Sequence, residues 1–132
     1  MTRIDDPATS LHFIVSEPNL PAMEIVHPQT DSSFVFFAAR VVPSEYAQRK
    51  LLEMDLGKRN ELSRDIRNKL LLCANVEFTI VGGESGMPKA YELFSRLFIR
   101  ENTVQDFWET YVKMKSAVVM IVSLIQDFVG LG

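Results

Sequence analysis

The chain has 132 residues, of which 47% are hydrophobic and 23% are charged, and its formal net charge is −3. This length is typical of one domain, and the composition excludes disordered, collagen-like and disulfide-rich proteins. The acidic balance argues against nucleic acid as a partner, because nucleic-acid binders usually present a basic surface. We therefore expect residues 1–132 to form a single domain.

Cysteine usage and the polarity of the N-terminus indicate the compartment. The single cysteine, Cys73, excludes an intramolecular disulfide and lies in an apolar run, so we interpret it as a small buried hydrophobe. The first residues lack the apolar segment of a signal peptide. The apolar run 117–125 is far shorter than the ~20 residues that span a bilayer. These features predict a cytoplasmic protein without a membrane partner.

Three strand-like runs come first, at residues 11–16, 22–27 and 34–42. A turn with two prolines, at residues 18–21, separates the first two runs and predicts a hairpin. Residues 34–37 are apolar at every position, which predicts a central strand covered on two sides.

A helix follows over residues 45–74, with Ser44 as its N-cap. One apolar face of this helix repeats at helical spacing through Leu62, Ile66 and Leu70. Gly57 interrupts the pattern and is unfavourable inside a helix, so we expect a kink or a split near residues 55–58.

Two further strands are predicted at residues 76–81 and 91–100, because apolar and polar side chains alternate in both. The element order is then β-β-β-α-β-β-α. We expect an α+β fold, with a five-stranded, mainly antiparallel sheet and two long helices packed against it.

The second long helix opens at residue 102 or 103, where Thr103 and Asp106 form a capping pair, and it stops at Gly130. It is apolar almost all round between residues 118 and 125, which is typical of a helix that is central or pressed against another surface. One interpretation is a homodimer interface. The alternative is that the sheet and the other helix cover this segment within one chain. The candidate interface residues are Val118, Ile121, Val122 and Ile125.

The glycine-rich loop from Gly82 to Lys89 resembles two catalytic motifs only superficially. A phosphate-binding loop needs lysine directly after its last glycine, whereas Met87 follows Gly86. A nucleophile elbow around Ser85 needs glycine where Met87 stands, and it leads into a helix rather than a strand. We interpret the loop as a hairpin connection. The alternative is a small-molecule binder or hydrolase that uses this loop, with Ser85 or Lys89 directed into a pocket.

No metal or cofactor site is predicted. His12 and His27 lie at equivalent places in neighbouring strands, but a zinc site needs three or four ligands and no acidic residue stands at a recognised spacing. No set of catalytic residues is apparent either, so we expect a protein that is not an enzyme.

The element order resembles the type III secretion chaperone fold, whose relatives include the YbjN-like proteins. The chain also resembles a largely archaeal family of domains of unknown function. Three stretches carry this similarity, Leu-His-Phe-Ile-Val-Ser at 11–16, Glu-Ile-Val-His-Pro at 24–28, and residues 58–72. The long helix after Thr103 matches the pattern too. The resemblance supplies no catalytic residues.

The first helix of the chaperone fold, which helps secretion chaperones to form dimers and grip their clients, has only the residues before Leu11 available here. Taken together, the residues and the resemblance predict a non-enzymatic module, chaperone-like or otherwise protein- or peptide-binding. Its expected partners are a second copy of itself and an unidentified protein or peptide.

Overall fold

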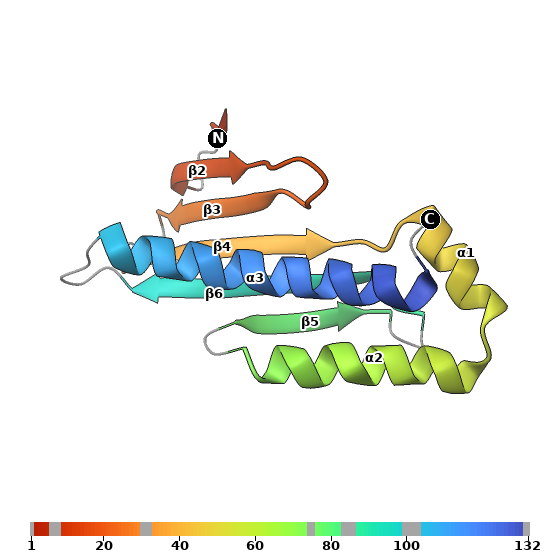
Figure 1. Ribbon diagram of the computed structural model, residues 1–132. Helices are drawn as coiled ribbons and strands as arrows, with labels where there is room; N and C mark the ends of the chain where they lie inside the picture. The colour runs from red at the N-terminus through yellow and green to blue at the C-terminus, as the bar shows by residue number, and fades with distance from the viewer. Residues whose placement is uncertain are drawn as a thin grey trace.

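A computed structural model of the protein describes residues 2–5, 9–29, 33–73, 76–82, 87–98 and 104–130. This part of the chain forms an α+β fold with six strands and three helices (Figure 1). The strands are β1 Thr2–Arg3, β2 Thr9–Val15, β3 Met23–Pro28, β4 Phe34–Val41, β5 Glu77–Val81 and β6 Ala90–Phe98. The helices are α1 Glu45–Glu53, α2 Leu56–Leu71 and α3 Val104–Val129.

The strands form one antiparallel sheet in the order β1-β2-β3-β4-β6-β5. The prediction of five strands is wrong by one, because Thr2 and Arg3 pair with Ile14 and Phe13 as an extra edge strand. Two residues are too few to show an alternating pattern, so sequence alone does not reveal β1. This strand occupies part of the segment in which the chaperone fold has its first helix.

The helix predicted over residues 45–74 is split, as expected from Gly57. The Ala47 N–H donates to Ser44 Oγ at 3.1 Å and caps α1, which confirms the predicted N-cap. The Lys58 N–H donates to Asp55 Oδ1 at 2.8 Å and caps α2. Asp55 thus opens a second helix, and the prediction of two long helices becomes three helices, of which α1 is short.

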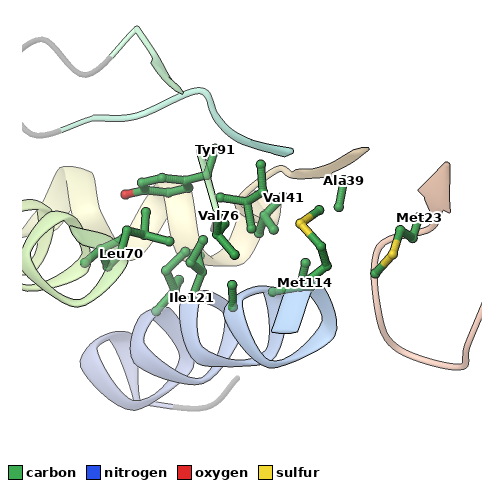
Figure 2. Close-up of a cluster of buried hydrophobic side chains, with 14 of the residues drawn as sticks. Met23, Ala39, Val41, Leu70, Val76, Tyr91, Met114 and Ile121 are labelled. Atoms are coloured by element: carbon green, nitrogen blue, oxygen red, sulfur yellow. The ribbon is translucent and has the colours of Figure 1, made fainter. Parts of the chain in front are cut away.

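Helix α3 lies across the middle of the sheet, over β4 and β6, and it also contacts α1 and α2 (Figure 1). The core lies between α3 and the sheet side chains that point toward it, including Phe37 and Leu93, both fully buried. Figure 2 shows Met114 extending from α3 toward Ala39 and Val41. Burial of such side chains is the main favourable term that holds the layers together.

The opposite face of the sheet is apolar but open in the described part of the chain. Successive side chains of a strand point to opposite faces, so Phe34 and Phe36 point away from the core that contains Phe37. Neither Phe34 nor Phe36 is among the side chains that pack on the core. Within the described residues, the prediction that residues 34–37 are covered on two sides is therefore wrong, although β4 is a central strand.

Among the residues that the structure describes, no helix is long and apolar enough to cross a membrane.

Candidate functional site

An apolar pocket lies where the C-terminal half of α3 meets the start of α1. Its volume is about 390 Å³, which falls within the size range of ligand pockets in proteins. Four segments supply its walls. They are the turn between β2 and β3, the end of β4, the first turn of α1, and the last turns of α3.

The connection between β4 and α1 lines one side of this pocket. Pro43 has no N–H for the β4 ladder, and Ser44 caps the following helix, so the chain turns sharply between the two elements. The side-chain amide of Gln48 donates to the Pro43 carbonyl at 2.9 Å. Both hydrogen bonds hold residues that line the pocket.

The chemistry of the pocket is apolar and uncharged. Its aliphatic walls come from residues that are buried in the chain, namely Val41, Ala47, Ile125 and Val129. Its polar lining residues are neutral, namely Asn19, Ser44, Tyr46 and Gln126. Amide and hydroxyl groups of this kind both donate and accept hydrogen bonds. The arrangement favours an uncharged, mainly apolar ligand with a few hydrogen-bonding groups.

A hydrogen bond and an ion pair connect the β2–β3 turn to α3 beside the pocket. The Tyr111 hydroxyl donates to Glu17 Oε1 at 3.0 Å, and Lys115 Nζ lies 2.8 Å from Glu17 Oε2. The hydrogen bond from Lys115, followed by that from Tyr111, lowers the pKa of the Glu17 carboxyl. The hydrogen bond to Glu17 raises the pKa of Lys115 in turn. Both shifts favour the charged pair near neutral pH. Asn19, two residues after Glu17, adopts φ 64°, a left-handed conformation that asparagine tolerates well.

The four residues predicted as a dimer interface do not form a common surface. Val118, Ile121 and Ile125 are buried within the chain, at 3%, 0% and 6% exposure. Val122 is half-buried and lines the apolar pocket. A helix that is apolar all round is thus explained largely by the core of one chain, which was the alternative interpretation.

The glycine loop is described only at its ends, and Ser85 lies outside the described residues. The Lys89 N–H donates to the Val81 carbonyl at 2.8 Å, which closes the hairpin. Gly82 has φ 69°, and a β-carbon added there would lie 3.0 Å from Lys89 Cγ. The Lys89 stem therefore lies beside Gly82, and the positive φ explains the glycine at this position.

The two histidines point to opposite faces of the sheet. His12 pairs with Val26 and His27 pairs with Leu11. These two pairs follow each other directly along the strands, and successive side chains point to opposite faces. Nε2 of His12 lies 3.4 Å from Glu24 Oε2. No group of three or more potential metal ligands occurs among the described residues.

Sequence reasoning identified parts of the pocket without identifying the pocket. The proline-flanked turn at 18–21 and the Ser44 cap were both predicted, as local features. These two segments come together at the end of α3 because of the way α3 crosses the sheet. No local sequence pattern specifies that crossing, so the pocket could not be predicted from the sequence.

The comparisons with known proteins agree with this fold and name no activity. A family model described as "Uncharacterized conserved protein (DUF2299)" matches residues 1–125. A search of the curated proteins finds no match. Among solved structures, the chain is similar to an uncharacterized protein from Methanothermobacter thermautotrophicus, with a TM-score of 0.84 and 18% sequence identity. That match covers 98% of this chain and 89% of the other.

Proposed function

The chain belongs to the DUF2299 family of uncharacterized conserved proteins, and from its pocket we propose that it is a non-enzymatic binding module for an apolar segment of another polypeptide. The observation that carries the proposal is the uncharged, apolar lining of the 390 Å³ pocket between α1 and α3. A charged metabolite would lose its hydration in such a pocket without gaining an opposite charge.

A polypeptide suits both the size of the pocket and its polar groups. The volume lies near the lower end of the range for ligand pockets, which fits one or two apolar side chains. The side-chain amides of Asn19 and Gln126 can pair with a peptide backbone, because each offers both a donor and an acceptor. The resemblance to secretion chaperones, which grip protein clients, favours the same class of ligand.

The outer side of α3 offers an approach to the pocket. Apolar side chains are exposed along it at Trp108, Val112 and Val119. At 100° per residue, these positions lie on the same side of the helix as Val122 and Gln126, which line the pocket. A bound segment would therefore extend from the pocket along this stripe.

The proposal is tested with amino-acid amides as probes, read by amide chemical shifts in NMR spectra. We expect N-acetyl-leucinamide and N-acetyl-phenylalaninamide to shift the resonances of Ala47 and Gln126 saturably, while N-acetyl-aspartate leaves them unchanged. Val122→Phe, which fills the pocket from its edge, removes the shifts. Leu71→Phe on α2, 67% exposed and outside both the pocket and the stripe, retains them as the control. Shifts that survive Val122→Phe, or that never appear at these residues, refute the proposal.

A further inference from the structure

The sheet face turned away from α3 carries an aromatic cluster at its centre. The rings of Phe36 and Phe94 stack with centroids 5.7 Å apart, and those of Phe34 and Phe98 meet at 6.2 Å. The Arg96 guanidinium lies over the Phe34 ring, 5.7 Å from its centroid. Phe98 is 51% exposed although it is a large apolar side chain. A contiguous apolar patch with charged neighbours marks a surface that another molecule covers.

The sequence of β4 also indicates that this face has a cover. A strand with apolar side chains on both faces is typical of a sheet buried on both sides. In the part of the chain that the structure describes, α3 covers the face of Phe37, and Phe34 and Phe36 lie outside the core that it forms. A second layer over this face would have to come from outside the described residues.

The residue pairs across β4 and β6 make the open face complementary to a second copy of itself. Arg40 lies opposite Glu92, and Ala38 lies opposite Phe94. A two-fold axis parallel to these strands and midway between them places β4 of one copy over β6 of the other, at the same height. Each Arg40 then faces Glu92 of the second copy, and the aromatic clusters meet at the centre.

The size of the overlap sets the strength of such a contact. About the axis between β4 and β6, the strands β3, β4, β6 and β5 of each copy overlap, and they present roughly 450 Å² in projection at the usual strand spacing and rise. This is a little more than half of the roughly 800 Å² per partner that a standard-size interface buries, so the contact corresponds to a weak dimer. Two sheets stacked face to face also pack well when their strands are nearly aligned.

We infer that the open face of the sheet is the interface of a homodimer, in which two copies pack face to face about an axis parallel to β4 and β6. The interface is independent of the pocket between α1 and α3, which lies on the other side of the sheet. Charge complementarity between Arg40 and Glu92 sets the alignment, and the phenylalanine cluster supplies the apolar contact.

The same axis places an acidic residue of one copy opposite an acidic residue of the other, at the edge of the interface. Glu24, Ala38, Phe94 and Glu77 lie in one row across β3, β4, β6 and β5. The axis brings β3 of one copy over β5 of the other, so Glu24 faces Glu77 of the second copy. This repulsion weakens the dimer slightly, and replacing Glu77 with lysine is expected to tighten it.

The test is the mass of the intact chain by light scattering and sedimentation across a dilution series. The wild type is expected at twice its 15.0 kDa chain mass. Phe98→Asp is expected to give the single-chain mass with unchanged circular dichroism, because Phe98 is half-exposed before the change. Trp108→Asp on α3, at a similar 54% exposure, is the matched control and remains dimeric.

A charge exchange tests the proposed alignment. Arg40→Glu alone and Glu92→Arg alone each raise the dimer Kd about tenfold or more. The double variant restores the wild-type Kd, and Glu77→Lys lowers it. A wild type that is monomeric throughout the dilution series overturns the inference, whatever else binds this face. A dimer broken by Trp108→Asp but not by Phe98→Asp, or a double variant that fails to restore association, overturns it as well.

Discussion

The Glu17 carboxylate accepts hydrogen bonds from both Tyr111 and Lys115, which lie 94 and 98 residues further along the chain, and so links the β2–β3 turn to α3. Chain-distant links of this kind restrain a turn that the sheet alone holds only at its two ends. The turn also supplies Asn19 and Pro21 to the pocket. The stability of the fold and the shape of the pocket therefore depend on the same carboxylate.

Replacing Glu17 with glutamine is expected to lower the melting temperature slightly at neutral pH, with a small effect because the pair is exposed. The folded-state pKa of Glu17 lies below the ordinary value of 4.5, so its stabilisation is present above pH 4.5 and is lost as the pH falls through the folded-state pKa. Thermal melts of the wild type and the variant should therefore converge in acid. Glu61→Gln, exposed on α2, is the control. A difference that stays constant down to the acid limb contradicts the assignment.

Replacing Ile121 with alanine is expected to cost about 2–5 kcal/mol of unfolding free energy, because its side chain is fully buried in the core. Urea denaturation of the variant measures this loss. Val119→Ala, on the exposed side of the same helix, is the control and should change stability by well under half of that amount. An Ile121→Ala variant as stable as the control would mean that this residue serves a surface rather than the core.

The sequence and the structure agree best where one local rule decides the outcome. Alternation along residues 91–98 correctly separates the buried Tyr91 and Leu93 from Glu92. Gly57 correctly marks the break between α1 and α2, because the cap at Asp55 and the unfavourable glycine act at the same place.

The sequence and the structure disagree where an apolar segment could be buried by more than one neighbour. An apolar side chain indicates that it is buried, but it does not indicate which element or which molecule covers it. The run at 118–125 was open to two interpretations, and its central residue Ile121 lies in the core of the chain itself. Phe34 and Phe36 give the same kind of signal, yet the described part of the chain leaves them on the face away from the core.

Replacing Gly82 with alanine is expected to destabilise the β5–β6 hairpin by about 1–2 kcal/mol. Its φ of 69° lies in the left-handed region, and an added β-carbon would lie 3.0 Å from Lys89 Cγ. The double change Gly82→Ala with Lys89→Ala should recover the steric part of the loss and retain the backbone part. Chemical denaturation of both variants provides the comparison. A Gly82→Ala variant with wild-type stability would show that the hairpin does not depend on this conformation.

Replacing Tyr91 with phenylalanine is expected to raise the unfolding free energy by about 1 kcal/mol. The residue is 1% exposed, and its hydroxyl has no hydrogen-bond partner among the described residues, so the wild type buries a polar group without compensation. Replacing the hydroxyl with hydrogen removes that cost and keeps the ring beside Leu70 (Figure 2). Urea denaturation at neutral pH measures the gain, with Tyr46→Phe on α1 as the control.

The same residue predicts how stability changes in alkali. Burial raises the pKa of the Tyr91 hydroxyl to about 12 from its ordinary value of 10.0. Between these values the unfolded chain loses the proton while the folded chain keeps it, so the folded state binds more protons and stability falls as the pH rises. Tyr91→Phe lacks this titration, and its advantage over the wild type should widen from pH 10 upward. An advantage that is constant with pH would show that the hydroxyl ionises as freely in the folded chain as in the unfolded one.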